Sequence, residues 1–371
     1  MPTSIRTIAR QLGVSSTTVC RALRGEGRIS PALRQKIKDT AAETGYQVHP
    51  LLSQALSLSR QPIGERYRET FGLILEFPSE NGPDYQKQMH EAAEARAASL
   101  ACKLEPFIVS GKPAEHRRWS SIFRARGIRG LIIFPRLLNR QPRLHLEWEH
   151  FAAVEIKQTL WHPRNLHRID NSAYLKTIEA MHLLKKVGYR RIGMAVEEIH
   201  NLQNSGVYYA PYLLMQQKLP ARDRIPIFDM IAGRSEASFR KWMEKYRPDV
   251  LLVHNVVDIC AWLHNMGLRV PQDISLFNTN VQKFDYPGYH SQYDWSGCRW
   301  DFPGMGQRAV DLLSRLLQNG EMGLAGNSTC WLVDEFWVGG GTLSLPIADH
   351  ITPEGFLKTP ASKNSLSRRP W

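Results

Sequence analysis

Side chains that hydrogen-bond nucleic acids are concentrated between residues 15 and 28, near the start of the chain. If residues 16–24 form a helix, Val19, Ala22 and Leu23 occupy the face that packs inward. The opposite face then carries Ser16, Thr17, Cys20, Arg21 and Arg24. Serine, threonine and arginine bond base edges and phosphate oxygens, and one helix fits the major groove of duplex DNA. The chemistry that this segment predicts is recognition of double-stranded DNA.

The charge of the chain favours the same partner. The 371 residues include 48 lysines and arginines against 35 aspartates and glutamates, a formal net charge of +13. Residues 1–60 hold nine of the basic residues and only three of the acidic ones. This local excess of positive charge indicates that the N-terminal segment is the module that binds a polyanion.

Three short helices are predicted to position these side chains. Their caps and stops are Ser4 and Gly13 for the first helix, Ser15 and Gly25 for the second, and Ser30 with Pro31 and Gly45 for the third. Two helices joined by a tight glycine turn are typical of a helix-turn-helix domain. A purely structural bundle of three helices is the alternative, and the polar outward face of the second helix favours DNA binding over it.

The rest of the chain alternates apolar strands with longer helical segments. The predicted strands lie at 71–77, 104–110, 128–135 and 151–156, and then at 190–196, 225–230, 249–255 and 274–280, with terminal strand material at 330–343. The predicted helices lie near 84–100, 114–126, 172–187, 205–218, 235–246 and 257–266, with one more at 304–319. This βα alternation predicts parallel sheets flanked by helices, arranged in two similar halves. The tail from 346 to 371 is predicted to be disordered because it has little apolar content.

The sequence offers no constellation for catalysis or for a metal ion. It has no G-x-G-x-x-G, Walker A, G-x-S-x-G or H-E-x-x-H motif, and its five cysteines are scattered. His145, His150 and His162 are spaced too irregularly for one helix face, so we interpret that run as a solvated loop. We therefore expect a protein that is not an enzyme and that needs no cofactor or metal. Because no apolar run approaches the length of a membrane span and no export signal is present, we expect a cytoplasmic protein without membrane contact.

Residues 4–58 resemble the DNA-binding headpiece of the LacI/GalR (lactose-repressor) family. The family pattern T-I-x-D-V-A-x-x-A-G-V-S-x-x-T-V-S-R-x-L-N-G is answered by Ser4-Ile5, Ile8-Ala9, Leu12-Gly13-Val14-Ser15 and Thr18-Val19-Cys20-Arg21-Ala22-Leu23, and its continuation by Ile29-Ser30, Arg34, Ile37 and Gly45-Tyr46. A looser match runs to about residue 345 through H-R-I-D-N (167–171), V-G-Y-R-R-I-G (187–193), V-P-Q-D-I-S-L (270–276) and W-V-G-G-G-T-L (337–343).

The resemblance implies a domain plan and a mode of action. The N-terminal all-α helix-turn-helix headpiece occupies 1–48, a hinge helix and linker occupy 49–67, and the tail occupies 346–371. Residues 68–345 form an α/β domain of two lobes, similar to periplasmic sugar-binding proteins. The implied function is a transcriptional repressor that binds a pseudo-palindromic operator as a homodimer.

The resemblance also implies which residues contact DNA. The set is Ser4, Ser15, Ser16, Thr17, Thr18, Cys20, Arg21, Arg24, Arg28 and Leu56. Cys20 stands where the family has a phosphate-contacting serine, and Arg24 stands where it has an asparagine. The leucine that the family inserts into the minor groove falls on Ala55 here, so Leu56, one residue later, is the expected wedge.

A small effector, a sugar or sugar derivative, is expected between the two lobes. Asn280 stands where the family often has an aspartate that binds a sugar hydroxyl, and an amide both donates and accepts hydrogen bonds. Tyr208, Trp161 and Asp170 complete the candidate set. One alternative is that the domain only dimerises or senses a partner protein. Another is a solute-binding receptor or a sugar-handling enzyme built on the same lobes, neither of which would need residues 1–58.

Overall fold

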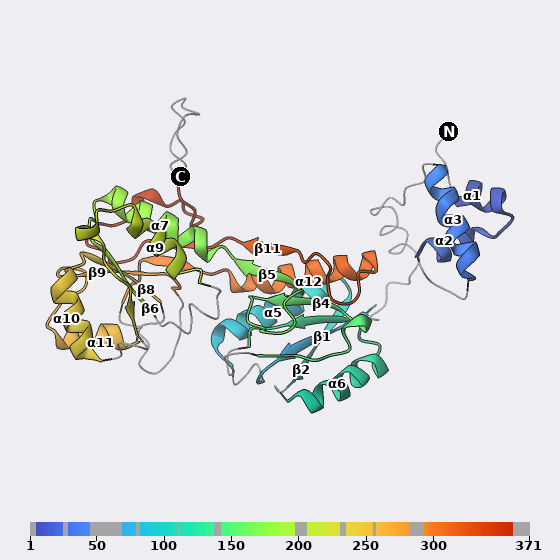
Figure 1. The fold of residues 1–371 in the computed structure, drawn as a ribbon, viewed down its shortest axis with the longest axis horizontal. Coiled ribbons are helices and arrows are strands. Elements are labelled where there is room, and N and C mark those ends of the chain that lie inside the picture. Colours follow the sequence, from blue (N-terminus) through green and yellow to red (C-terminus); the bar gives the residue numbers. More distant parts are fainter. Residues whose placement is uncertain are drawn as a thin grey trace, which may run out of the picture. The chain divides into compact units, whose positions relative to one another are not determined.

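The computed structural model describes residues 5–24, 29–44, 69–78, 82–109, 112–136, 142–196, 206–230, 235–254, 257–281 and 293–358. The chain divides into two compact units, Met1–Arg66 and Tyr67–Trp371 (Figure 1). Among the described residues, no helix is long and apolar enough to cross a membrane.

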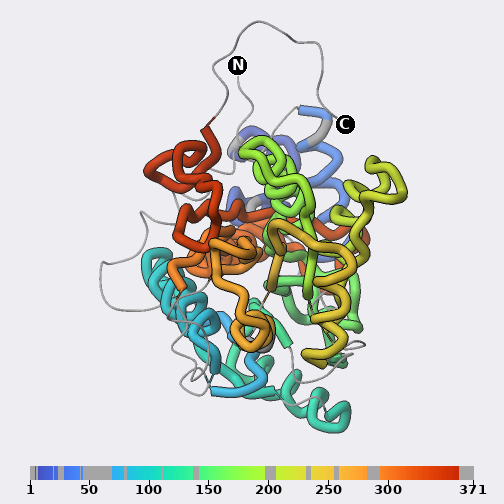
Figure 2. The backbone as a smooth tube through the Cα atoms, turned by 90° about the vertical axis from the view of Figure 1, so that its left-hand side faces the viewer, coloured from blue at the N-terminus to red at the C-terminus, as the bar shows by residue number. Residues whose placement is uncertain are grey.

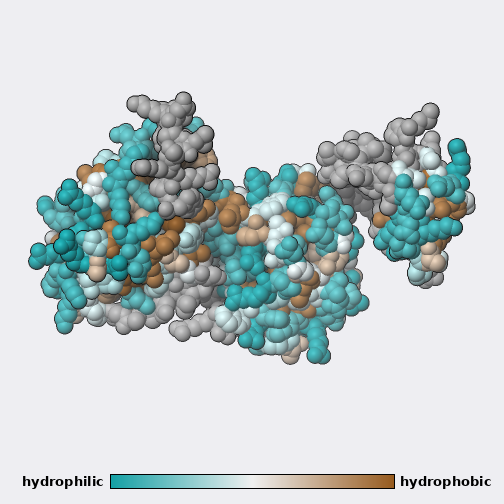
Figure 3. All heavy atoms as spheres, turned by 45° about the horizontal axis from the view of Figure 1, so that its top comes forward, coloured by the Kyte–Doolittle hydropathy of each residue, from teal (hydrophilic) through white to brown (hydrophobic). Residues whose placement is uncertain are grey.

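The N-terminal unit is a bundle of the three predicted helices, α1 (Ile5–Leu12), α2 (Ser16–Arg24) and α3 (Pro31–Glu43). Gly13 links α1 to α2 with a φ of 65°, a backbone conformation that favours glycine. The backbone N–H of Thr18 donates to Ser15 Oγ at 3.0 Å, and that of Leu33 donates to Ser30 Oγ at 3.3 Å, so both predicted N-caps are formed. The buried core of this unit consists of Ile8, Ala9, Val19, Ala22, Ile37 and Ala41. Most of its visible surface is hydrophilic (Figure 3).

The first lobe of the second unit is a parallel sheet with strand order β11-β5-β4-β3-β1-β2. Its strands are β1 (Glu69–Leu75), β2 (Cys102–Ile108), β3 (Gly130–Ile133), β4 (Ala152–Ile156), β5 (His167–Asn171) and β11 (Cys330–Val333). Helices α5 (Asp84–Ser99) and α12 (Phe302–Asn319) cover one face of the sheet, and α6 (Pro113–Ala125) covers the other (Figure 1). Helices α5 and α12 approach so closely that a Cβ atom on Gly306 would lie 2.2 Å from the carbonyl oxygen of Met89.

The second lobe repeats this arrangement with strand order β12-β10-β9-β8-β6-β7. Its strands are β6 (Ile192–Val196), β7 (Phe228–Asp229), β8 (Val250–Val253), β9 (Ser275–Asn278), β10 (Gly297–Arg299) and β12 (Phe336–Val338), of which β12 alone is antiparallel to its neighbour. Helices α7 (Ala173–Val187) and α9 (Tyr209–Gln217) pack on one face, and α10 (Glu236–Tyr246) and α11 (Val257–Asn265) pack on the other. The predicted fold class of two α/β lobes is thereby confirmed.

The chain crosses between the lobes three times, which the order of elements in the sequence did not predict. The crossings are β5 to α7, β10 to α12, and β11 to β12. As a result α12 and β11 return to the first lobe after the second lobe has been built, and Figure 1 shows them beside α5 and β5; Figure 2 views the same chain along the direction from the second lobe to the first. Each lobe therefore combines segments that lie far apart in the sequence.

Two further expectations differ from the structure. Residues 346–358 were predicted to begin a disordered tail, yet Ile347 is fully buried and the N–H of Trp337 donates to Gly355 O at 2.7 Å. The few apolar side chains of this stretch are enough to anchor it to the second lobe, and residues 359–371 lie outside the described part of the chain. The histidine run is not simply a solvated loop, because the ring of His145 stacks between those of His116 and His162 at centroid distances of 5.9 and 5.3 Å.

Candidate functional site

The outward face of α2 presents the predicted base-reading side chains to solvent. Ser16, Thr17 and Arg21 are exposed, whereas Val19 on the opposite face is fully buried. Within the described part of the chain, none of these three polar side chains is engaged in a hydrogen bond to another residue. Ser15 differs, because its Oγ accepts from the N–H of Thr18 and lies 2.8 Å from Thr18 Oγ1. Ser15 therefore fixes the start of the helix, and the three exposed side chains remain available to a ligand.

The remaining predicted DNA contacts cannot all be placed. Ser4, Arg28 and Leu56 lie outside the described residues, as does the whole predicted hinge at 49–67. Cys20 and Arg24 belong to α2, but their side chains also lie outside the described part.

A group of mostly buried polar side chains lies where the lobes are joined. Lys157 Nζ is 2.7 Å from Asp170 Oδ1, and it also donates to Asn171 Oδ1. Asn171 Nδ2 in turn donates to Glu335 Oε1 at 2.5 Å. The ammonium group of Lys157 lies 4.4 Å from the centroid of the Trp300 ring. We call this set the interlobe cluster: Lys157, Asp170, Asn171, Lys176, Tyr208, Trp300, Asp334 and Glu335.

Lys176 supplies the second cation of the cluster. Its Nζ lies 2.9 Å from Asp334 Oδ1 and 3.2 Å from Glu179 Oε2, and 5.3 Å from the centroid of the Trp337 ring. Because Lys176 is buried on α7 and Asp334 lies in the connection from β11 to β12, this ion pair ties the second lobe to that connection.

Tyr208 brings the second lobe into the same cluster. Its side chain is 1% exposed, and its hydroxyl has no hydrogen-bond partner among the described residues. Its ring contacts His254 at a centroid distance of 4.7 Å, and His254 Nδ1 lies 3.0 Å from Thr279 Oγ1. Burial, with a smaller contribution from Glu335 and Asp170, raises the pKa of Tyr208, so its hydroxyl keeps its proton and needs an acceptor.

Glu335 is the carboxyl group most perturbed by these surroundings. Its side chain is 1% exposed, and burial raises its pKa from 4.5 to about 7. Lys157, Asn171 and Lys176 oppose that rise, which identifies desolvation as the dominant cause. The Glu335 carboxyl group therefore gains and loses its proton near neutral pH, and it lies between the two lobes.

The four predicted effector residues are only partly brought together. Asp170 and Tyr208 are members of the interlobe cluster. Asn280 is buried directly after β9, next to Thr279, and its N–H donates to Asn278 Oδ1 at 2.9 Å. Trp161 is 46% exposed, and its ring stacks on Arg164 at 4.5 Å in the first lobe, with no contact to the cluster among the described residues.

Sequence reasoning did not identify Lys157, His254 or Glu335. Lys157 is the first residue after β4, and His254 is the first residue after β8. Polar residues that directly follow parallel strands lie at the sheet edge where ligands bind in open α/β folds. The positions of Lys157 and His254 could therefore have identified them as candidate site residues from the sequence. Glu335 carried no such signal, because it lies in a two-residue connection between a parallel and an antiparallel strand.

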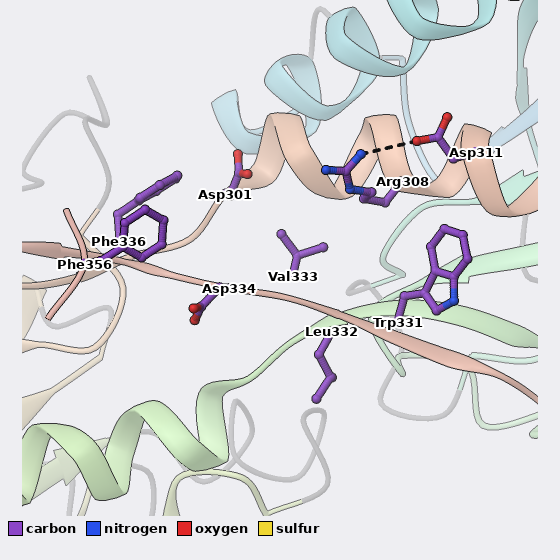
Figure 4. Close-up of a pocket in the computed structure, with 9 residues that line it drawn as sticks. All are labelled: Asp301, Arg308, Asp311, Trp331, Leu332, Val333, Asp334, Phe336 and Phe356. Atoms are coloured by element: carbon purple, nitrogen blue, oxygen red, sulfur yellow. Dashed lines mark hydrogen bonds and ion pairs between the residues drawn. The ribbon is translucent and has the colours of Figure 1, made fainter. Parts of the chain in front are cut away.

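A hollow of about 570 Å³ lies between α12 and β11, and Asp334 belongs both to its lining and to the interlobe cluster. Val333 and Trp331 face the helix, whereas Leu332 points to the opposite side of the strand (Figure 4). Three of its charged lining groups are already paired: Asp311 lies 2.6 Å from Arg96 and 3.4 Å from Arg308, and Asp334 lies 2.9 Å from Lys176. This hollow contains none of the predicted effector residues, so its volume alone does not mark it as the effector site.

Comparisons with known proteins agree with the fold of both units. The family of bacterial regulatory proteins called the lacI family matches residues 4–48, and a periplasmic binding protein-like domain matches residues 181–327. The chain carries a LacI-family helix-turn-helix domain followed by a periplasmic-binding-protein-like domain. The predicted resemblance is thus confirmed, and the three described helices of the N-terminal unit are the LacI-type helix-turn-helix domain.

Individual relatives of this chain are distant. The HTH-type transcriptional regulator DegA of Bacillus subtilis (strain 168) is 24% identical over 302 residues, which cover 74% of this chain and 81% of DegA. A complex of the transcriptional regulator CelR with cellobiose has a TM-score of 0.54 at 16% identity and covers 92% of this chain and 99% of that one. The lac repressor dimer bound to operator and the anti-inducer ONPF has a TM-score of 0.50 at 20% identity and covers 93% of this chain and 100% of that one. The two structures show a shared fold.

Proposed function

We propose that this regulator is a repressor that binds a pseudo-palindromic operator as a homodimer through α2. The observation that carries the proposal is the polar face of α2, where Ser16, Thr17 and Arg21 are exposed above a buried Val19. A helix whose polar face is exposed and whose apolar face is buried can enter the major groove without disturbing the core of its own domain. The match to the lac repressor fold, a protein described as bound to operator, supports the same reading.

A band-shift measurement with Arg21→Ala tests the proposal. A bidentate contact from Arg21 to a base is worth roughly 1–3 kcal/mol, so affinity for the operator should fall about tenfold or more while affinity for random duplex changes little. Lys38→Ala, on the exposed surface of α3, is the matched control because it removes a cation from the same domain. Equal losses on both duplexes would reduce Arg21 to a phosphate contact.

The other predicted contacts belong to the same proposal. Ser4, Arg24 and Arg28 would hold phosphates, since hydroxyl and cationic groups near a recognition helix fix its register on the backbone, and Cys20 would face a phosphate with the weaker donor of a thiol. Leu56 would be the minor-groove wedge, because it offers more apolar area than Ala55. Leu56→Ala should then reduce DNA bending in a permuted-fragment assay, and unchanged bending would remove the wedge from the proposal.

We further propose that a small polyhydroxylated effector, a sugar or sugar derivative, binds at the interlobe cluster. Tyr208 Oη and Trp300 Nε1 are buried donors without a hydrogen-bond partner among the described residues, and unsatisfied buried donors mark a missing acceptor. The carboxylate of Asp170 is 22% exposed and can accept from a hydroxyl group. The complex of CelR with cellobiose, whose fold this chain shares, supports a saccharide as the ligand class.

Calorimetric titration of the full chain with monosaccharides, oligosaccharides and sugar acids tests the effector. Tyr208→Phe should weaken binding of the active compound about fivefold, the usual worth of one buried hydrogen bond. Tyr174→Phe removes a hydroxyl from an exposed side chain of α7 and should leave affinity unchanged. If no compound binds at millimolar concentration, the effector domain acts only in dimerisation or in sensing a protein.

A further inference from the structure

Each of the three connections between the lobes carries a member of the interlobe cluster. Asn171 ends the strand that leads to α7, Trp300 lies between β10 and α12, and Glu335 lies between β11 and β12. Any change in the relative position of the lobes must be absorbed by backbone rotation at these three places, because no other described segment joins the two sheets. Contacts between the connections therefore decide which relative position is favoured.

Lys157 comes from outside the connections and is linked to all three of them, to the third through one intervening side chain. It follows β4, a strand of the first lobe, and its ammonium group bonds Asp170 and Asn171 at the end of β5, where the first connection begins. The same group lies 4.4 Å from the centroid of the Trp300 ring on the second connection. It reaches Glu335 on the third connection through a single amide, that of Asn171.

The backbone of Lys157 is held in an unfavourable conformation for a residue with a side chain. Its φ is 65°, in the left-handed region, and its N–H donates to Ile169 O at 2.8 Å. Glycine or asparagine would make this turn at lower cost in free energy, and strained positions of this kind collect at functional sites. The turn therefore does not explain a lysine here, whereas the contacts of its ammonium group do.

We infer that Lys157 is an interlobe latch, whose ammonium group holds the three connections in one arrangement and so sets the equilibrium between the relative positions of the lobes. The ammonium group is shielded from water, since Lys157 is 6% exposed and Trp300 is 8% exposed. A desolvated cation over a tryptophan ring, together with a close carboxylate, can favour one position over another by tenfold or more. The consequence for operator affinity rests on the proposed function, but the latch itself does not.

Distance measurements by double electron–electron resonance test the latch without DNA or effector. Spin labels replace Ser121 on α6 and Lys241 on α10, two exposed positions of the first and second lobes. Serine replaces the exposed Cys330 and also Cys20, so that only the introduced cysteines are labelled. Lys157→Met keeps the length of the side chain but removes its charge. In this variant the population of a second interlobe distance should be at least tenfold larger than in the parent protein.

Three comparisons make the result decisive. Lys157→Arg keeps the cation and should restore the parent distribution, and Lys103→Met, which removes a surface lysine of the first lobe, should leave that distribution unchanged. If Lys157→Met fails to fold by circular dichroism, Trp300→Leu removes the ring from the ammonium group and should produce the same second population. A distribution identical to the parent in a folded Lys157→Met or Trp300→Leu variant would overturn the latch. That outcome would leave the effector titration untouched, so failure of the latch and failure of the proposed function are distinguishable.

Discussion

Replacement of Glu335 by glutamine should stabilise the second unit, and increasingly so as the pH rises. The raised pKa means that the folded protein binds the proton of Glu335 more tightly than the unfolded chain does, between an ordinary value of 4.5 and a folded value of about 7. For an acid shifted in this direction, stability is highest when the group is protonated and is lost as the pH rises through this window. Glutamine resembles the protonated form at every pH, so the variant avoids the loss.

The size of the effect follows from the same two values. The difference between a pKa of 4.5 in the unfolded chain and one of about 7 in the folded protein corresponds to about 3 kcal/mol. The free energy of unfolding of Glu335→Gln should therefore exceed that of the parent by about 1 kcal/mol at about pH 5 and by about 3 kcal/mol at about pH 8. Glu155 is also buried with a raised pKa, but it is present in both proteins and cancels in the difference.

Urea unfolding followed by tryptophan fluorescence measures this difference. All ten tryptophans lie at residue 119 or later, so the signal reports on the second unit and not on the N-terminal one. Glu244→Gln, on the exposed surface of α10, is the control for removal of a carboxylate and should show no dependence on pH. The reasoning fails if the advantage of Glu335→Gln is the same at all pH values, or if it grows as the pH falls.

Two further substitutions test helix packing inside the first lobe and helix capping inside the N-terminal unit. Gly306→Ala should destabilise the second unit by about 3 kcal/mol in urea unfolding, because the added Cβ would lie 2.2 Å from the carbonyl oxygen of Met89. Gly326→Ala is the control and should be neutral, because the space around Gly326 is open. Similar losses of stability in the two variants would contradict the close approach of α5 and α12. Ser30→Ala should destabilise the N-terminal unit by about 1 kcal/mol, because the N–H of Leu33 loses its acceptor, and hydrogen exchange of α3 should accelerate about fivefold. Unchanged exchange in α3 would show that the cap contributes nothing.

The elements that the sequence predicted well are those with a strong local signal. Helix α10 begins where Ser235 accepts from the N–H of Ser238, and the apolar run of β8 is buried along its whole length. Strand β10 was missed because three residues, Gly297–Arg299, are too few to show a period. The N-terminal helices were predicted correctly because each has both a cap and a glycine or turn at its boundary.

The candidate site was harder to predict because it is assembled from distant positions. The bond from Asn171 to Glu335 joins residues 164 positions apart in the sequence. Only the return of β11 to the edge of the first sheet brings Glu335 to that place, and this routing leaves no mark in the local pattern. Asp170 was a candidate because it lies in a motif of the family resemblance, and Tyr208 was one because an aromatic ring can stack on a sugar, whereas Glu335 carries no such signal.

The charges of the interlobe cluster bear on the kind of effector that it can accept. Two lysines, Lys157 and Lys176, face three carboxyl groups, those of Asp170, Asp334 and Glu335. With Glu335 protonated the cluster is electrically balanced, and with Glu335 ionised it carries one negative charge. An anionic effector would add a like charge beside these carboxylates in a poorly hydrated site, which costs free energy unless a cation accompanies it. A neutral ligand with hydroxyl groups can instead donate to Asp170 and accept from Tyr208, so among the titrated compounds uncharged saccharides should bind more tightly than the corresponding sugar acids.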